Sequence, residues 1–220
     1  MSINLINRIF TSLILLSILF LCLFVNKFLW TYLMVTASII LFYEINNMFK
    51  KINRNKIQLY NVVSIFYLIF FIYSGFYFYE TSKETLVIIL FICFSSDTGG
   101  YIIGKMIGGK KLTKISPNKT ISGSIGSFFF SLIPITIAIF YFNPSSNAIL
   151  YYNNILILIL MSLILSLICQ LGDLFISFLK RKAKIKDTGS ILPGHGGLLD
   201  RVDGLIFVLP FSYILDRIFL

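Results

Sequence analysis

The chain has 220 residues, of which 57% are hydrophobic and only 13% are charged, and its mean hydropathy is +0.89. This composition excludes an ordinary soluble domain and predicts an all-α, polytopic integral membrane protein. The net charge of +10 does not indicate a nucleic-acid-binding protein, because the cations gather on alternate loops between apolar segments.

Seven apolar segments predict about seven transmembrane helices. In chain order they cover 9–25, 28–43, 57–79, 85–104, 121–142, 149–179 and 203–219. A span needs about 20 residues, so the first, second and last are short. The last gains length only from residue 198 onward, which would place Asp200 and Asp203 inside that helix at the membrane edge. The first is interpreted as a retained span, because no small-x-small cleavage site follows it.

The distribution of lysine and arginine predicts the orientation of the helices. Every cation except Lys27, Lys83 and Arg217 falls at the N-terminus or on the loops after the second, fourth and sixth segments. By the positive-inside rule these regions are cytoplasmic, so we expect a cytoplasmic N-terminus and a C-terminus on the opposite side. Residues 44–56 are predicted to be a polar cytoplasmic connector, and 143–148 an external turn. The cysteines, Cys22, Cys93 and Cys169, look like packing residues within apolar runs.

Two acids are predicted to share one depth in the membrane. Asp97 lies eight residues before Lys105, and Asp173 lies seven residues before Lys180. At 1.5 Å per residue, each acid lies about 10–12 Å inside the charged boundary. We therefore expect one polar cavity between helices, although a local hydrogen bond for each acid is the alternative. Gly100, Gly104 and Gly108 indicate close helix packing, or an approach of the backbone to a phosphate.

The most polar stretch is residues 170–204, which holds four aspartates, six cations, six glycines and the only histidine. Its pattern is Ser177-Phe-Leu-Lys-Arg-x4-Lys186-Asp187-x-Gly189-x2-Leu-Pro-Gly-His195-Gly-Gly-x2-Asp200-Arg201-x-Asp203. We expect the loop around His195 to present amide groups to an anion. Helix capping is the alternative role for Asp200 and Asp203, while hard oxygen ligands of this kind suit Mg²⁺.

This pattern closely resembles the signature of the CDP-diacylglycerol synthases (phosphatidate cytidylyltransferases). A second segment, Lys114-Ile-Ser116-Pro-Asn-Lys119-Thr120-Ile-Ser122-Gly-Ser124, resembles the family's Ser-Pro-x-Lys-Thr-x-Glu-Gly element. Ser122 stands where the family commonly has glutamate, and Lys105 stands where arginine is frequent. The resemblance covers about 95–126 and 168–205. One integral domain is predicted over 1–220, because no polar stretch is long enough for a second. Within it, the resemblance implies a catalytic part in 85–220, and residues 1–80 match only as N-terminal spans.

The resemblance implies transfer of a cytidylyl group from CTP to phosphatidate, giving CDP-diacylglycerol and pyrophosphate. It implies Mg²⁺ held by Asp173 and Asp200, with a second, monovalent cation such as K⁺ left open. The expected partners are CTP, phosphatidate and membrane lipids but no nucleic acid, and a homodimer stays open. The expected location is the inner (plasma) membrane, with the active site facing the cytoplasm.

The residues that could carry this chemistry fall into two sets. The candidate catalytic residues are Asp173, Asp200, Lys186, Asp187, His195, Arg201 and Asp203. The candidate substrate-binding residues are Asp97, Ser116, Lys119, Thr120, Lys180, Arg181, Gly196 and Gly197. Two alternatives remain: a CTP-dependent isoprenoid or polyprenol lipid kinase, and a non-catalytic, transporter-like membrane protein.

Overall fold

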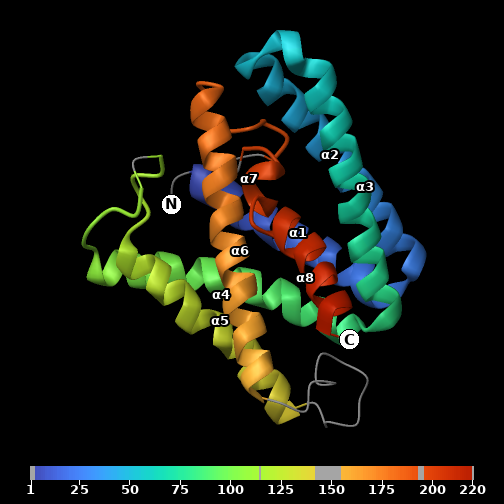
Figure 1. The fold of residues 1–220 in the computed structure, drawn as a ribbon, viewed down its shortest axis with the longest axis vertical. Helices are drawn as coiled ribbons and strands as arrows, with labels where there is room; N and C mark the ends of the chain where they lie inside the picture. Colours follow the sequence, from blue (N-terminus) through green and yellow to red (C-terminus); the bar gives the residue numbers. More distant parts are fainter. Residues whose placement is uncertain (1–2, 114, 142–154, 193–195, 220) are drawn as a thin grey trace. The chain divides into compact units, whose positions relative to one another are not determined.

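The computed structural model describes residues 3–113, 115–141, 155–192 and 196–219, and its regular structure there is helical. Each of the seven apolar segments forms a helix (Figure 1). They are α1 (Ile3–Val25), α2 (Lys27–Ile52), α3 (Ile57–Thr81), α4 (Lys83–Ile107), α5 (Ile121–Tyr141), α6 (Ile155–Lys182) and α8 (Leu205–Phe219). Two short helices join them, η1 (Arg54–Lys56) and α7 (Leu199–Val202). The external turn expected at 143–148 lies outside the described residues.

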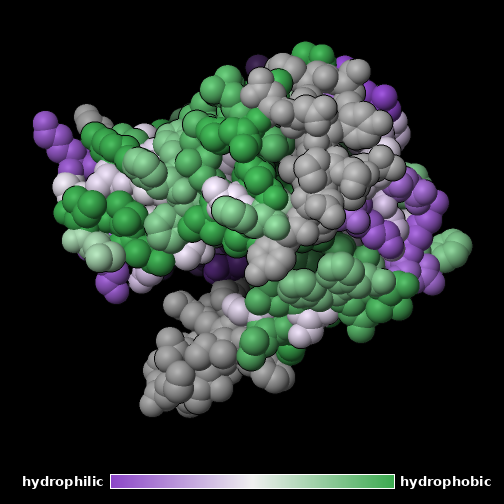
Figure 2. Space-filling model, turned by 90° about the horizontal axis from the view of Figure 1, so that it is seen from below, coloured by the Kyte–Doolittle hydropathy of each residue, from purple (hydrophilic) through white to green (hydrophobic). Residues whose placement is uncertain are grey.

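Five helices are long and apolar enough to cross a membrane: α2, α3 together with η1, α4, α5 and α6. α1 has a shorter apolar stretch, Thr11–Val25, and α8 has only 15 residues. Apolar side chains cover much of the face shown in Figure 2. Helices suit this setting because each satisfies its own backbone hydrogen bonds in hydrocarbon. The chain is therefore an all-helical, polytopic membrane protein.

Two predicted boundaries are wrong. α2 continues through Ile52, so most of the stretch expected to be a connector is helical, and Glu44 within it is buried. At the C-terminus, Asp200 lies in the separate four-residue helix α7, and Asp203 lies in the turn before α8. These two aspartates therefore do not extend the last helix, because the backbone turns at Asp203 and Gly204.

The helices belong to two compact units. The first contains Met1–Tyr79 and Leu179–Asp203, and the second contains Glu80–Phe178 and Gly204–Leu220. In the first unit, α2 and α3 form an antiparallel pair joined at both ends. The Trp30 indole donates to the Gly75 carbonyl at 3.1 Å and stacks on Tyr79, while Phe49 stacks on Tyr60 near the connecting turn.

Glycines join α4 and α5 in the second unit. A Cβ added at Gly99 or Gly123 would meet a backbone carbonyl of the opposite helix at 2.7 Å. Gly100 and Gly104 face the same seam, which confirms the packing role predicted for them. Gly108 has another role: its φ of +65° ends α4, and its N–H donates to the Gly104 carbonyl.

Serine hydroxyls connect α6 to the same pair of helices. Ser96 on α4 and Ser166 on α6 lie 2.8 Å apart through their hydroxyl oxygens, and Ser162 donates to the Ser131 carbonyl on α5 at 2.6 Å. Such contacts hold helices together where surrounding lipid removes the hydrophobic driving force. All three cysteines are buried and none forms a disulfide, which agrees with the packing role predicted for them, and the Cys169 thiol also donates to the Asp97 carboxylate at 3.8 Å.

The α4–α5 seam yields a stability prediction. In Gly126→Ala the new methyl group would lie 2.8 Å from the Gly99 carbonyl oxygen and 2.5 Å from the Ile103 Cβ. Neither atom is the flexible end of a side chain, so overpacking should cost about 1–3 kcal/mol. We expect a lower midpoint of thermal unfolding for the detergent-solubilised protein, followed by size-exclusion chromatography after heating.

Gly75→Ala is the matched control. Its methyl group would meet the terminal methyl of Met34, which can rotate away, and alanine favours the helix by about 1 kcal/mol. The Gly75→Ala protein should therefore unfold at or above the wild-type temperature. Equal destabilisation by the two substitutions would contradict the proposed seam.

Candidate functional site

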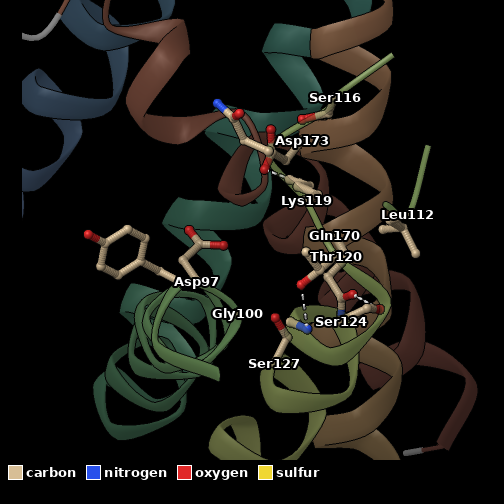
Figure 3. Close-up of a pocket in the computed structure, with 13 residues that line it drawn as sticks. Asp97, Gly100, Leu112, Ser116, Lys119, Thr120, Ser124, Ser127, Gln170 and Asp173 are labelled. Atoms are coloured by element: carbon tan, nitrogen blue, oxygen red, sulfur yellow. Dashed lines mark hydrogen bonds and ion pairs between the residues drawn. The ribbon is translucent and has the colours of Figure 1, made fainter. Parts of the chain in front are cut away.

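A cavity of about 360 Å³ lies within the second unit, between α4, the 112–124 segment, the start of α5, and α6. Asp97 from α4 and Asp173 from α6 both line it (Figure 3). The shared polar cavity predicted from their equal depth is therefore confirmed. Ser116 and Lys119 line the same space, so the two acids and the predicted substrate-binding segment meet in one place.

Lys119 makes an ion pair with Asp173 across this cavity. The backbone around Lys119 is held by three hydrogen bonds: its N–H donates to the Ser116 carbonyl at 3.1 Å, its carbonyl accepts from Leu112 at 2.8 Å, and Ile121 donates to Lys110 at 3.0 Å. These bonds bring residues 110–112 beside residues 119–121 at the end of α4. The lysine is thus carried on a constrained loop that aims it at a carboxylate.

Several hydroxyl groups of the predicted substrate-binding segment, residues 116–124, form hydrogen bonds that hold this segment in place. The Thr120 hydroxyl accepts from the Gly123 N–H at 3.1 Å, as an N-cap of α5 does. Ser122 donates to the Gly108 carbonyl, and Ser124 donates to the Gln170 amide oxygen on α6. Ser116 keeps its place in the cavity wall. The 116–124 segment is therefore bound to α4, α5 and α6.

The cavity suits a hard cation in its donor types. Asp97 and Asp173 offer carboxylate oxygens, and the ammonium group of Lys119 already sits on Asp173. Mg²⁺ sites commonly use one or two carboxylates together with substrate phosphates and water. Within the described ranges, no group of three or more histidine, cysteine, aspartate or glutamate residues forms a complete protein site. Asp200 belongs to the first unit, so a joint site of Asp173 and Asp200 stays a prediction.

Asp200 is the centre of a second cluster, in the first unit. Its Oδ1 accepts from Lys180 at 2.8 Å, and its Oδ2 accepts from the Thr188 N–H, the Thr188 hydroxyl and the Gly197 N–H at 2.8–3.0 Å. Burial by itself would raise the pKa of this carboxyl group, but the hydrogen bonds and the Lys180 charge together lower it. Asp200 is therefore an ionised carboxylate at neutral pH.

The glycines beside Asp200 allow the loop to close around carboxylates. Leu192 and Gly196 exchange backbone hydrogen bonds at 2.9 and 3.1 Å, and Gly196 has a φ of +86°. A Cβ at Gly196 would lie 3.0 Å from the Asp200 Oδ2. The N–H groups of Gly196 and Gly197 thus bind Leu192 and Asp200, so the anion held by this part of the loop is the protein's own.

The remaining predicted residues lie at the edge of this cluster or outside the described part. Arg181, Lys186, Asp187 and Arg201 are exposed to solvent, and Asp203 is half-buried. Their catalytic or binding roles stay predictions. His195, predicted to be catalytic, lies outside the described residues, as do Pro193 and Gly194.

Two residues of these sites, Gln170 and Glu44, were not predicted from the sequence. Gln170 lines the cavity and binds Ser124, one helical turn before Asp173. Glu44 on α2 is 1% exposed, and its carboxylate accepts from Thr188 and from the backbone of Leu198 and Leu199. A signal for Glu44 was present: it is the only acid in residues 1–79, and it lies beside an apolar run, where a carboxylate is costly.

Several curated proteins are similar to a large part of the chain. A phosphatidate cytidylyltransferase from Staphylococcus aureus (strain COL) is 50% identical over 143 residues, which are 63% of this chain and 52% of that protein. Phosphatidate cytidylyltransferases from Staphylococcus epidermidis (strain ATCC 12228 / FDA PCI 1200) and Staphylococcus haemolyticus (strain JCSC1435) are each 46% identical over similar lengths and the same shares. The chain thus spans about half the length of the curated relatives it matches.

The sequence profile of the cytidylyltransferase family matches residues 55–219. The match includes α3 to α8, and with them the Asp97–Asp173 cavity, Lys119, and the loop that carries Asp200. It covers well over half of the chain, and the chain belongs to the cytidylyltransferase family.

Proposed function

We propose that this protein is a phosphatidate cytidylyltransferase, which joins CTP and phosphatidate to give CDP-diacylglycerol and pyrophosphate. The observation that carries the proposal is the cavity in which Asp97, Asp173 and Lys119 meet. Two acids and a cation beside a Ser/Thr-rich loop suit a reaction between phosphate groups. The family match and the names of the relatives support the choice of substrates.

The reaction makes one bond and breaks one bond at the α-phosphorus of CTP. An oxygen of the phosphatidate phosphate attacks, and pyrophosphate leaves with its electron pair. This nucleophile is already anionic near neutral pH, so no general base is required. The main difficulty is to bring two polyanions together and to stabilise the charge that moves onto pyrophosphate.

The chain's own residues would meet this difficulty by holding phosphate oxygens in place. Lys119, on its constrained loop, donates to a phosphate oxygen in exchange for its partner Asp173. Asp173, freed from Lys119, and Asp200 are the carboxylates that would hold Mg²⁺, with Asp97 beside Asp173. The metal ion, when bound, screens phosphate charge and polarises the phosphoryl group. A second, monovalent cation such as K⁺ fits the same proposal.

We also propose the number of membrane spans and their orientation. With α1 and α8 counted as spans, the chain crosses the inner membrane seven times, its N-terminus and the 105–120 and 180–201 segments facing the cytoplasm. The supporting observation is the clustering of cations on those segments. Soluble CTP then reaches the site from the cytoplasm and phosphatidate reaches it from the bilayer. One integral domain and a homodimer remain compatible with this arrangement.

Incubation of membranes containing the full chain with labelled CTP and phosphatidate tests the function. We expect a labelled CDP-lipid when CTP carries the label in its α-phosphate. A phosphorylated isoprenoid alcohol, formed with γ-labelled CTP and the alcohol, would instead identify a lipid kinase. If neither condition gives a lipid product, the proposal that the protein is an enzyme is overturned.

The carboxylates yield the first prediction for this function. Asp173→Asn and Asp200→Asn remove a negative charge with little change in volume, and each should lower CDP-lipid formation at least ~100-fold at saturating Mg²⁺. Asp216→Asn, the same change near the end of α8, should retain activity. Near wild-type turnover by either of the first two variants would exclude that carboxylate as a metal ligand.

The cations yield the second prediction. Lys119→Gln, Lys186→Gln and Arg201→Gln should each cost a charge-assisted hydrogen bond to phosphate, about 1.5–3 kcal/mol. This corresponds to about a 10- to 150-fold loss of kcat/KM. Arg201→Lys should also lower kcat/KM if the guanidinium group binds phosphate through two hydrogen bonds, because lysine cannot make this paired contact.

Lys50→Gln and Lys182→Gln are the controls for the cation series. Both lysines are exposed near the ends of their helices, where the number of positive charges matters more than their position. We expect close to wild-type kcat/KM for both controls. A similar, small loss in all five glutamine variants would mean that the cations act only as a diffuse positive field.

Single-cysteine labelling checks the topology. In a background without Cys22, Cys93 and Cys169, cysteines at Lys110 and Lys182 should react with a membrane-impermeant reagent only after the cells are opened. Lys182 is chosen over Lys184 because Lys184 has a φ of +57°, where substitution adds backbone strain. Labelling of either position in intact cells would overturn the proposed orientation.

A further inference from the structure

Glu44 is a buried carboxylate that the proposed reaction does not use. It lies in the last third of α2, with 1% of its surface exposed, and precedes the matched range 55–219 of the family profile. A carboxylate in such a place needs donors or a cation, because an unsatisfied buried charge is strongly destabilising. The hydrogen bonds of Glu44 therefore indicate its role in the structure.

Three donors from the 188–199 segment meet the Glu44 carboxylate. Its Oε1 accepts from the Leu198 N–H at 2.9 Å, and its Oε2 accepts from the Leu199 N–H at 2.9 Å and the Thr188 hydroxyl at 2.8 Å. These contacts are 144–155 residues apart in the chain and lie within the first unit. Glu44 thus joins an N-terminal helix to both ends of the loop that precedes Asp200.

Thr188 connects Glu44 directly to Asp200. Its hydroxyl oxygen lies 2.8 Å from the Glu44 Oε2 and 3.0 Å from the Asp200 Oδ2, and its N–H donates to the same Asp200 oxygen. One hydroxyl proton therefore serves two carboxylates. A displacement of the Glu44 side chain would remove a partner from Thr188, and Thr188 supplies two of the contacts that place Asp200.

Two glycines leave the space that this arrangement needs. A Cβ at Gly197 would fall 2.5 and 2.7 Å from the Glu44 oxygens, and a Cβ at Gly189 would fall 2.8 Å from Oε1. The backbone of the loop therefore approaches the carboxylate more closely than side chains permit. This fit distinguishes Glu44 from an acid that merely caps a helix end at the surface.

We propose that Glu44 is a positioning residue, which holds the 188–200 loop so that Asp200 is presented in its working orientation. The catalytic consequence rests on the function proposed above, whereas the placement of the loop does not. The competing role is simple stabilisation of the fold. In that case loss of Glu44 would lower the amount of folded protein but leave each folded molecule as active as the wild type.

Glu44→Gln is the informative substitution, because it keeps the size of the side chain. Whichever oxygen becomes an NH₂ group, it faces a backbone N–H, of Leu198 or of Leu199, and cannot accept from it. We expect the amides of Leu198 and Leu199 to exchange hydrogen for deuterium at least ~10-fold faster in the purified full-length protein. The specific activity per folded molecule should fall about 10- to 150-fold, the loss expected for one charge-assisted hydrogen bond.

Glu84→Gln is the matched control, since Glu84 is exposed in the first turn of α4. In the Glu84→Gln protein, the hydrogen–deuterium exchange rates of the Leu198 and Leu199 amides and the specific activity should equal those of the wild type. Wild-type exchange in Glu44→Gln, or faster exchange with full specific activity per folded molecule, would overturn the positioning role.

A second pair of variants keeps the test decisive if Glu44→Gln does not fold. Thr188→Val removes the shared hydroxyl with little change in shape, and Thr188→Ser restores it. We expect Thr188→Val to lower specific activity about 10-fold or more and Thr188→Ser to recover most of it. Equal activity of the valine and serine variants would show that the hydroxyl link does not place Asp200.

The exchange measurement separates this inference from the proposed function. If the wild-type protein makes no CDP-lipid, the proposed function fails, while faster exchange in Glu44→Gln still shows that Glu44 holds the loop. If the wild type is active and neither the exchange nor the activity responds to Glu44→Gln, only the positioning role fails.

Discussion

A carboxylate withdrawn from water must receive hydrogen-bond donors or a cation, and this requirement accounts for the polar architecture of the protein. Asp173 receives the Lys119 ammonium group, Asp200 receives Lys180 and two backbone amides, and Glu44 receives two backbone amides and a hydroxyl. These contacts fix loop residues to helices: Lys119 to α6 through Asp173, and Thr188, Leu198 and Leu199 to α2 through Glu44.

The same requirement explains the glycines. The loop before Asp200 carries glycine at 189, 196 and 197, because a Cβ at any of these positions would lie within 3.0 Å of a carboxylate oxygen of Glu44 or Asp200. Along the α4–α5 seam, glycine serves a different purpose, since it lets two helix backbones approach where lipid provides no drive for association. One residue type thus supports both the polar clusters and the apolar packing.

Constrained loops carry the proposed site residues in both units. Lys119 lies on a segment closed by backbone hydrogen bonds, and Asp200 follows a loop tied to α2 and α6 by Glu44 and Lys180. Such preorganisation suits electrostatic catalysis, because a fixed charge needs little reorganisation as charge develops in the transition state. The proposed transfer between phosphate groups, which needs no general base, would gain most from such an arrangement.

Local pattern was sufficient for much of the fold and part of the site. Apolar runs, three of them shorter than a full span, predicted the seven helices. The spacing of Asp97 and Asp173 from the lysines placed both acids in one cavity, because the rise per residue in a helix is constant. The motifs around 95–126 and 168–205 determined the family. Only the tertiary structure decided that α7 is separate from α8, since a turn at 203–204 competes with continued helix there. Only it revealed the partners of Glu44, because hydrogen bonds across more than 140 residues depend on how the chain packs and leave no periodic trace in the sequence.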